Sequence, residues 1–227
     1  MSERHNRRSP YTIDVVLLTQ IKGQLDVLLC RAPPPEGREK WALPWETPRN
    51  DESLDGAARR IAKAALGAEP GWLEQIAAFG DGKRHPGDFE ISVAFGALVA
   101  MGTPSPLGGS YAWFPLGDVP QLFARQRQML DGAMSMVRSR MDQEPVAFGL
   151  LPQMFTLTEL QQTYELLLEK RLHKASFRRA LQAAWLVEPT DEWRSEGRGR
   201  PAQLYRYAPR KRRPAQRGIR LDLAAPR

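Results

Sequence analysis

The first apolar segments of the chain follow the patterns of β-strands. Residues 11–31 contain two apolar, β-branched runs, YTIDVVLLT and LDVLLCR, with a turn at Gly23–Gln24 between them. This arrangement predicts a hairpin-like pair of strands. Two more strands are predicted in LEQIAAFGD and FEISVAFGALVA, which flank a turn at HPGD.

Helical periodicity separates and follows these strand segments. From Asp51 to Leu66 the apolar residues recur at close to 3.6-residue intervals, which predicts a helix capped by Asp51 or Ser53. After WFPLGDVP, residues 121–141 have the pattern of a longer amphipathic helix. Strand, strand, helix, strand, strand, helix is the order of an α+β or mixed α/β/α domain.

The pattern changes after a proline-marked connector at residues 144–154. FTLTELQQTYELLLEK carries an apolar stripe that predicts a helix with Thr158 as its N-cap. KASFRRALQAAW predicts a second helix with Phe177 in the core, and two β-type runs follow at residues 185–189 and 203–209. Helix, turn, helix and β-ribbon is the order of a winged helix-turn-helix.

These patterns divide the chain into four segments. We expect a disordered basic arm at residues 1–9, a first domain at 10–145, a winged helix-turn-helix at 146–208 and a basic tail at 209–227.

The distribution of charge agrees with this division. Residues 151–227 hold 16 Lys and Arg against 8 Asp and Glu, whereas residues 1–150 hold 17 against 18. A basic module joined to a near-neutral one is typical of a protein that binds a polyanion. Seven of the positive charges lie in residues 208–227, so a solvated basic tail accounts for part of the excess.

Composition excludes several other classes of protein. No apolar run approaches the roughly 20 residues of a membrane span, and the charged N-terminus has no apolar segment of a secretory signal behind it. Cys30 is the single cysteine, which leaves no internal disulfide and favours a buried structural thiol. We therefore expect a cytoplasmic protein without a membrane partner.

Residues 41–67, WALPWETPRNDESLDGAARRIAKAALG, have the outline of the Nudix box. That motif, G-x5-E-x7-R-E-U-x-E-E-x-G-U with U apolar, lets pyrophosphohydrolases bind Mg²⁺. Glu52, Arg60 and Gly67 fix the alignment, so the first glycine of the motif falls on Glu46.

The catalytic positions of the box hold the wrong residue types for hydrolysis. The three glutamate positions after the arginine hold Ile61, Ala64 and Ala65. Mg²⁺ requires oxygen ligands, and these side chains have none to offer. The glycine pair expected after LP is replaced by Trp45–Glu46, whose ring and charge should obstruct a pyrophosphate that approaches bare backbone. We predict a protein that is not an enzyme, with no catalytic residue, metal or cofactor.

The two halves together resemble Nudix-related transcriptional regulators of the NrtR type. The resemblance covers about residues 10–208 and is carried by WALP…DESLDGAAR, FGDGKRHPGDFEISVAFGALV, WFPLGDVP, AFGLLPQMFTLTELQQTYE, SFRRAL and GRGRPAQLYRY. It implies an α/β fold class: an N-terminal Nudix-like α/β/α sandwich with a mixed sheet, and a C-terminal winged helix-turn-helix. It also implies a homodimer that represses genes, with NAD metabolism as the expected target, and that senses a nucleotide-type effector such as ADP-ribose. Other regulators of the wider group respond to sugars.

The winged helix predicts a double-stranded DNA operator as partner. Arg can read guanine and Gln adenine in the major groove, while phosphate contacts hold the register. The candidate DNA-binding residues are Lys174, Ser176, Arg178, Arg179 and Gln182 of the second helix, with Arg198 and Arg200 of the loop GRGRP. The alternative is a solvated helix face and loop. His173, near the helix start, is interpreted as a polar cap.

The Nudix resemblance predicts an effector cleft between the box and the facing strands. Its candidate residues are Arg31, Trp41, Trp45, Glu52, Arg60 and Phe89. Arg60 and Glu52 can instead pair with each other for a structural reason. His85, in the Pro-Gly turn, is expected at the surface. Two other functions stay open: a pyrophosphohydrolase with a non-standard site, and a ligand-blind DNA-binding dimer.

Overall fold

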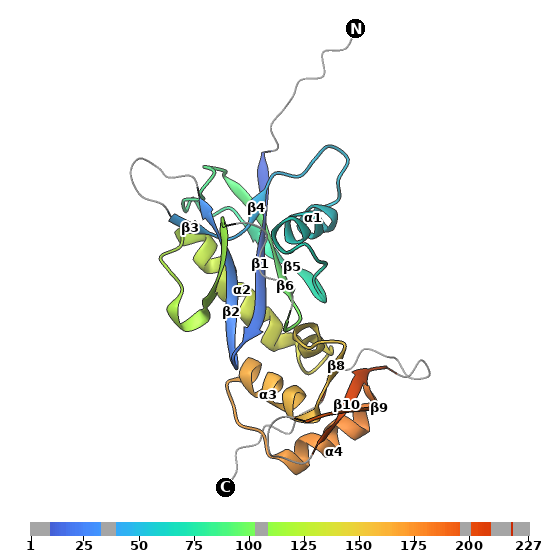
Figure 1. Ribbon diagram of the computed structural model, residues 1–227. Helices are drawn as coiled ribbons and strands as arrows, with labels where there is room; N and C mark the ends of the chain where they lie inside the picture. Colours follow the sequence, from blue (N-terminus) through green and yellow to red (C-terminus); the bar gives the residue numbers. More distant parts are fainter. Residues whose placement is uncertain (1–9, 33–39, 103–108, 196–200, 210–218, 220–227) are drawn as a thin grey trace.

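The computed structural model describes residues 10–32, 40–102, 109–195, 201–209 and 219, and shows a larger N-terminal part above a smaller C-terminal part (Figure 1). The predicted basic arm, most of the basic tail, and Arg198 and Arg200 lie outside the described residues. In the part of the chain that is described, no helix is long and apolar enough to span a membrane.

A hairpin forms the centre of the N-terminal part. Strands β1 (Tyr11–Ile21) and β2 (Gln24–Ala32) pair antiparallel, with Ile21 opposite Gln24. The turn is made by Lys22 and Gly23, whose φ angles are 49° and 81°, one residue earlier than predicted. Two positive φ angles match the right-handed twist of paired strands, and glycine adopts such a φ without steric cost.

Around this hairpin lies a mixed, seven-stranded sheet. Its path is β3-β2-β1-β6-β5, with β4 paired to β1 and β7 to β2. The remaining strands are β3 (Lys40–Ala42), β4 (Trp45–Glu46), β5 (Trp72–Phe79), β6 (Ile91–Leu98) and β7 (Tyr111–Pro115). β1 runs parallel to β6, and the other pairs are antiparallel. The predicted mixed sheet is thus confirmed, while β3, β4 and β7 add to the four predicted strands.

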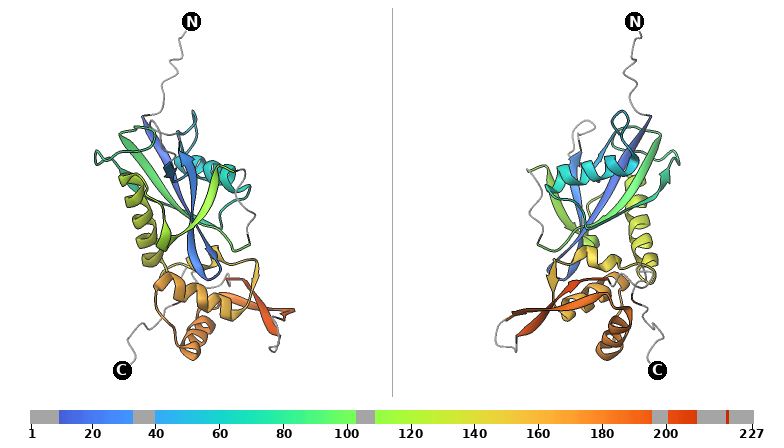
Figure 2. Two further views of the ribbon diagram at one scale, coloured as in Figure 1. Left: turned by 60° about the vertical axis from the view of Figure 1, so that its left-hand side comes forward. Right: turned by 90° about the vertical axis from the view of Figure 1, so that its right-hand side faces the viewer.

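One helix covers each face of the sheet, as the views in Figure 2 show. Helix α1 (Leu54–Leu66) packs with the side chains of one face, and α2 (Ala124–Arg140) packs with those of the other. Alternation along β1 explains the division, because successive side chains of a strand point to opposite faces. Ser53 caps α1 by accepting a hydrogen bond from the backbone of Gly56, as predicted, and α2 begins three residues later than predicted.

Short helical turns precede and follow α2. The 3₁₀ turn η1 (Leu116–Asp118) comes directly after β7, and η2 (Val146–Leu150) connects the two parts of the chain.

The C-terminal part is a winged helix, as predicted. Strand β8 (Met154–Phe155) leads into helices α3 (Leu157–Leu168) and α4 (Lys174–Ala184), and β9 (Val187–Arg194) and β10 (Ala202–Tyr207) form the ribbon. The sheet order is β8-β10-β9. The N-cap of α3 is Thr156, not Thr158, because Thr156 and Glu159 form a reciprocal capping box in which each side chain bonds the other's backbone nitrogen.

The two parts share one hydrophobic core. Leu18 and Leu29 of the sheet, Met129 of α2, and Tyr164 and Phe177 of the winged helix belong to one buried cluster. The winged helix therefore packs directly on the sheet and α2.

Candidate functional site

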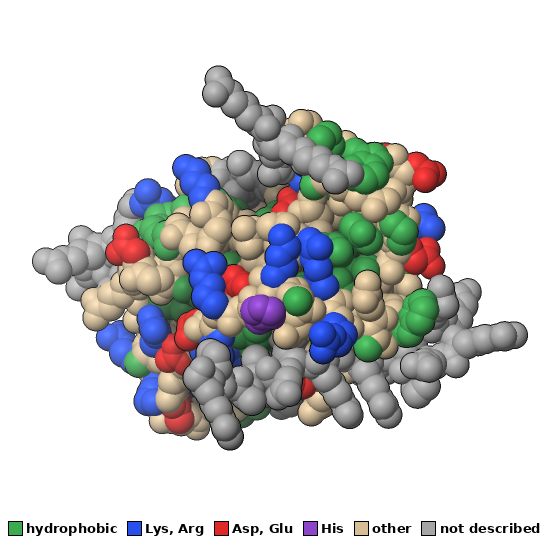
Figure 3. Space-filling view, turned by 90° about the horizontal axis from the view of Figure 1, so that it is seen from below, with side chains coloured by type: hydrophobic (Ala, Val, Ile, Leu, Met, Phe, Trp, Pro, Cys, Tyr) green, Lys and Arg blue, Asp and Glu red, His purple; other side chains and the backbone are tan. Residues whose placement is uncertain are grey.

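The exposed face of α4 carries all five of its predicted DNA-binding side chains. Phe177 and Leu181 are only 1% and 2% exposed, so they fix the opposite face of the helix in the core. The residues that remain exposed include Lys174, Ser176, Arg178, Arg179 and Gln182. Several Lys and Arg side chains gather near the middle of the end of the molecule to which α4 belongs, seen from below in Figure 3. The structure therefore places the five residues together on an accessible, positively charged surface.

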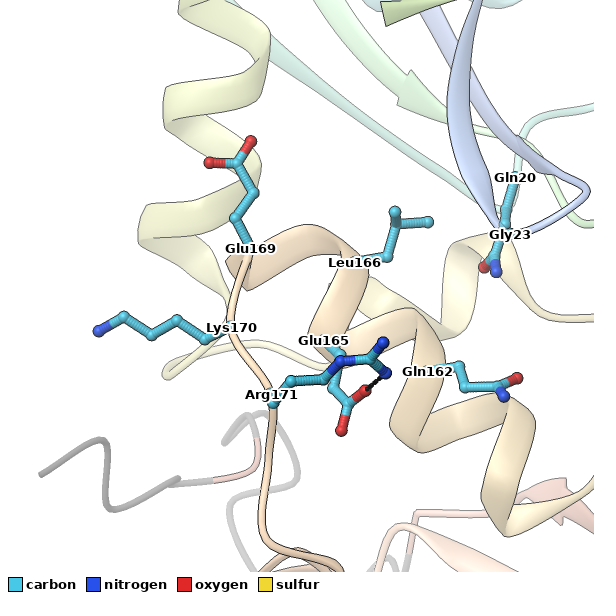
Figure 4. A pocket seen from close by; sticks show the side chains of 8 residues that line it. All are labelled: Gln20, Gly23, Gln162, Glu165, Leu166, Glu169, Lys170 and Arg171. Carbon is cyan, nitrogen blue, oxygen red and sulfur yellow. Dashed lines mark hydrogen bonds and ion pairs between the residues drawn. The ribbon is translucent and has the colours of Figure 1, made fainter. Parts of the chain in front are cut away.

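Glu165 of α3 contacts the turn between the two helices, residues 169–173. Its Oε1 accepts hydrogen bonds from the backbone nitrogen of Leu172 and from Nε2 of Gln161, both at 2.9 Å. Its Oε2 pairs with Arg171 at 3.1 Å, the contact drawn in Figure 4. Burial opposes ionisation, but the bonds from Gln161, Leu172 and Arg171 outweigh it and lower the pKa of Glu165. Sequence reasoning missed Glu165. The signal that could have identified it is its position directly after Tyr164, at the border of the apolar stripe of α3.

At the start of α4, His173 occupies the N-cap position without forming a side-chain cap bond. Its ring nitrogen Nδ1 lies 3.4 Å from Oγ of Ser176. The interpretation of His173 as a capping side chain was therefore wrong, although its position was right.

A polar cluster attaches the wing to the start of α3. Arg194 of β9 contacts Glu159 at 2.7 Å and donates a hydrogen bond to the carbonyl of Met154 at 3.3 Å. Glu159 also closes the capping box, so one carboxylate connects β9 with the first turn of α3. The adjacent Trp193 is 57% exposed.

The six predicted effector residues fall into three groups. Arg31 lies over the ring of Trp41, 5.0 Å from its centroid, and Trp41 packs edge-on against Phe114 at 4.7 Å. Glu52 and Arg60 form an ion pair, and Trp45 packs against Phe89 at a centroid distance of 5.9 Å.

Arg60 is held by two carboxylates. Its Nε and one terminal nitrogen bind the two oxygens of Glu52 at 2.8 and 2.9 Å, the structural pairing that the sequence suggested as an alternative. The other terminal nitrogen binds Glu46. The terminal nitrogen that binds Glu52 also donates a 3.2 Å hydrogen bond to the carbonyl of Thr47. The hydrogen bond with Arg60 lowers the pKa of Glu52 to about 2, and the same bond raises the pKa of Arg60.

The three former glutamate positions of the box lie on α1 in different surroundings. Ile61 and Ala65 are 3% and 0% exposed and pack in the core between α1 and the sheet, whereas Ala64 faces solvent. Across the described residues, no group of three or more His, Cys, Asp or Glu side chains is arranged to hold a metal ion.

Beside the box, aromatic rings cover a buried polar network. His85 is 1% exposed, its ring packs against Trp45 at 4.8 Å, and its Nε2 lies 2.9 Å from Oδ1 of Asp14. The same oxygen accepts a bond from Nε2 of Gln126 at 2.9 Å, and Thr12 donates to the other oxygen at 2.8 Å. The expectation that His85 lies at the surface was wrong, because the buried carboxylate of Asp14 requires polar partners. The sequence signal for this network is Asp14 itself, an acid inside the otherwise apolar run of β1.

The first turn of α2 connects this network to the loop before β6. Arg125 is only 1% exposed and donates a 2.6 Å hydrogen bond to the carbonyl of Phe89. Next to it, Gln126 also accepts a bond from the backbone nitrogen of Leu43 at 3.0 Å. Sequence reasoning placed both residues simply on an amphipathic helix. Cys30, expected to be buried, is partly buried: its Sγ lies 3.6 Å from the carbonyl oxygen of Leu43, and burial raises the pKa of the thiol to about 11.

Comparison with known protein families accounts for most of the chain. Residues 8–132 match the NUDIX domain, and residues 147–207 match the NrtR DNA-binding winged helix domain. A curated relative from Acinetobacter baylyi, "ADPR responsive transcriptional repressor NtrR", is 31% identical over 204 residues, which are 87% of this chain and 81% of the relative.

Solved structures show the same two-part architecture. The chain is similar to Shewanella oneidensis NrtR complexed with a 27mer DNA, with a TM-score of 0.79 and 29% identity over 88% of this chain and 94% of the other. A MutT/nudix family protein from Enterococcus faecalis is similar in fold, with a TM-score of 0.69, at 20% identity over 92% of this chain and 90% of that one.

Proposed function

This chain belongs to the NrtR family of Nudix-related transcriptional regulators, and from that premise we propose that it is a repressor whose operator binding responds to ADP-ribose. The observation that carries the proposal is the exposed polar and basic face of α4 on a winged helix that packs against a Nudix-like sheet. The similarity to an NrtR that was crystallised with DNA, and the match to a DNA-binding winged helix domain, support DNA as the partner.

In this proposal α4 enters the major groove. Arg178, Arg179 and Gln182 present the donors and acceptors that read base edges, while Lys174 and Ser176 contact phosphates. Arg198 and Arg200 of the wing loop add backbone or minor-groove contacts. A two-fold homodimer would place two such helices on a palindromic site, the usual geometry for this class of domain.

The effector binds the Nudix-like part. The name of the relative from Acinetobacter baylyi supports ADP-ribose, an anion that carries an adenine base. Among the predicted effector residues, Trp45 and Phe89 offer aromatic surface for a base, and Arg60, held by Glu46 on the other face of the sheet, offers a guanidinium for phosphate. Arg31 and Trp41 lie further along the sheet and would contact the rest of the ligand.

We propose further that the Nudix-like part does not hydrolyse its ligand. Ile61 and Ala65 fill core positions, and Ala64 has no oxygen donor, so the box helix offers no carboxylate at these three positions. Without them the site lacks the oxygen ligands by which Mg²⁺ polarises a pyrophosphate. Incubation with ADP-ribose and Mg²⁺ should therefore yield no AMP; metal-dependent release of AMP would contradict this part of the proposal.

The domain boundaries at residues 145–146 and 208–209 stay a prediction. Limited proteolysis followed by mass spectrometry tests them, because a cut in the connector before η2 should release a fragment that begins near residue 146.

The deciding experiment is fluorescence anisotropy of a labelled DNA fragment from upstream of the gene for this protein, with and without ADP-ribose. We expect tight binding that a scrambled fragment does not show and that ADP-ribose reverses. Specific binding that ignores ADP-ribose would leave a regulator with another effector. The variant Arg178→Ala/Arg179→Ala is the control, because it removes two exposed charges from α4 without touching the core.

A further inference from the structure

Glu46 lies where an anionic ligand would have to bind Arg60. It belongs to β4, opposite Ile13 of β1, and its side chain is 54% exposed. Its carboxylate binds the terminal nitrogen of Arg60 that Glu52 leaves free. Every nitrogen of the guanidinium therefore already has a hydrogen-bond acceptor in this arrangement, and a phosphate has to compete with one of them.

The two carboxylates that hold Arg60 differ in how easily a ligand can displace them. Glu52 is 17% exposed, binds Arg60 through both oxygens, and also accepts a bond from the backbone nitrogen of Arg49 at 2.9 Å. Glu46 contacts Arg60 through one oxygen and is about three times as exposed. A solvent-exposed, single-contact ion pair contributes little to stability, so the contact with Glu46 is the one that a ligand can replace.

We propose that Glu46 is a specificity-determining residue of the effector site: its carboxylate competes inside the protein with diphosphate-bearing ligands for Arg60. This inference rests on the proposed function and deepens it, because it identifies what ADP-ribose must displace in order to bind.

The competition has two physical components. A diphosphate must break the pair between Glu46 and Arg60, and it must then lie close to a carboxylate that has lost its partner. Arg60, Glu46 and Glu52 together carry one net negative charge, so the cluster repels a second anion until Glu46 moves away or is neutralised.

The isosteric substitution Glu46→Gln tests the inference, since it removes the charge and keeps the shape. Isothermal titration of the full chain with ADP-ribose and, separately, with inorganic pyrophosphate measures the effect. We expect both ligands to bind about tenfold more tightly to Glu46→Gln than to the native chain, a difference of about 1.4 kcal/mol. Glu46→Asp, which keeps the charge, should remain within about twofold of the native affinity.

Asp55→Asn is the matched control. Asp55 is an exposed acid of α1 that pairs with Arg59 at 2.8 Å. Its replacement by asparagine removes one negative charge from the same helix and leaves the contacts of Arg60 unchanged. We expect less than a twofold change in either affinity. A gain as large as that of Glu46→Gln would assign the effect to net charge and would overturn the inference.

A double-mutant cycle with Arg60→Gln isolates the competition for the guanidinium. Without Arg60, Glu46→Gln should improve diphosphate binding by less than threefold, since only the repulsion is relieved. An undiminished tenfold gain would overturn the inference. Thermal melts of each variant confirm that Arg60→Gln still folds.

The outcomes distinguish the inference from the proposed function. If ADP-ribose binds the native chain and Glu46→Gln equally, the inference is wrong and the proposed effector stands. If no variant binds ADP-ribose but pyrophosphate prefers Glu46→Gln, the proposed effector is wrong and the competition is supported. If neither ligand distinguishes the variants, the inference is overturned.

Discussion

Replacing Glu165 with alanine removes the carboxylate that holds the turn between α3 and α4. In the native chain its Oε1 accepts two hydrogen bonds of 2.9 Å, from the backbone of Leu172 and the side chain of Gln161. Without the carboxylate, the backbone nitrogen of Leu172 loses its acceptor. The first turn of α4 then loses the contact that fixes its direction relative to α3.

The three contacts do not contribute equally to stability. A hydrogen bond to a charged, largely buried group contributes roughly 1.5–3 kcal/mol. The side chain of Glu165 is 11% exposed, whereas that of Arg171 is 94% exposed, so the ion pair between them is screened and adds little. We expect Glu165→Ala to lower the free energy of unfolding by about 2 kcal/mol, and Arg171→Ala by less than about 0.5 kcal/mol.

DNA binding should separate a directing role from a stabilising one. The basic side chains of α4 stay in place, so the affinity for scrambled DNA, which depends on charge, should fall by less than about twofold. Operator affinity depends on the angle of α4 in the groove and should fall by about tenfold or more. Glu165→Gln keeps an acceptor for Leu172 and should recover most of this loss.

Urea denaturation and fluorescence anisotropy measure the two effects. Operator binding by Glu165→Ala that equals native binding, in a protein destabilised by 2 kcal/mol, would show that the contact stabilises without directing the helix. If Glu165→Ala keeps both the native stability and the native operator affinity, the role assigned to Glu165 is refuted.

Three further predictions concern the other surfaces. Arg178→Ala and Arg179→Ala should each weaken operator binding by about 1–3 kcal/mol, as expected for base contacts, whereas Lys174→Ala should reduce the salt dependence by about one unit of log–log slope, as expected for a phosphate contact. Gly87→Ala should disrupt the aromatic cluster, because an added Cβ would lie 2.5 Å from the ring of Trp45; loss of near-ultraviolet circular dichroism and of ADP-ribose binding would report it. The pKa of Glu52 is lowered from 4.5 to about 2 by its bond with Arg60, so its contribution to stability is complete above about pH 5 and is lost as the pH falls toward 2. Urea denaturation at several pH values measures the free energy of unfolding. Between about pH 5 and pH 2 this free energy should depend less on pH in Glu52→Gln than in the native chain, and an equal dependence would contradict the pairing.

Periodicity predicted the larger elements because burial imposes it. The helix from Leu54 to Leu66 and the two helices of the winged helix each have an apolar stripe that packs in a core, and the long strands have alternating or continuous apolar runs. Phe177 was assigned to the core on this basis and is 1% exposed. The exposed face of α4 followed from the same pattern, since the other positions of that helix have no core to face.

Periodicity does not reveal contacts between residues far apart in the chain. The pairing of Asp14 with His85 joins residues 71 positions apart, and that with Gln126 joins residues 112 apart. β3, β4 and β7 have only two to five residues each, too few for a periodic pattern. Glu165 and Arg125 have polar side chains within amphipathic helices, where the pattern alone predicts a solvated position.

The box separates the requirements of the fold from those of hydrolysis. Arg60 and Glu52 fasten the segment before α1 to the second turn of that helix, a role that does not depend on a metal. Two positions that hold glutamate in the motif are occupied here by Ile61 and Ala65, which bury apolar surface against the sheet and so stabilise the packing of this helix. Apolar side chains at these positions are thus compatible with the fold, and the proposed absence of hydrolysis follows from the oxygen ligands that they lack. Beside the box, the rings of Trp45 and Phe89 are only partly buried, and the first turn of α2 contacts the loop that carries Phe89. From there α2 extends to Arg138, which donates a hydrogen bond to the carbonyl of Leu167 in α3, so a single helix contacts both the candidate effector site and the winged helix.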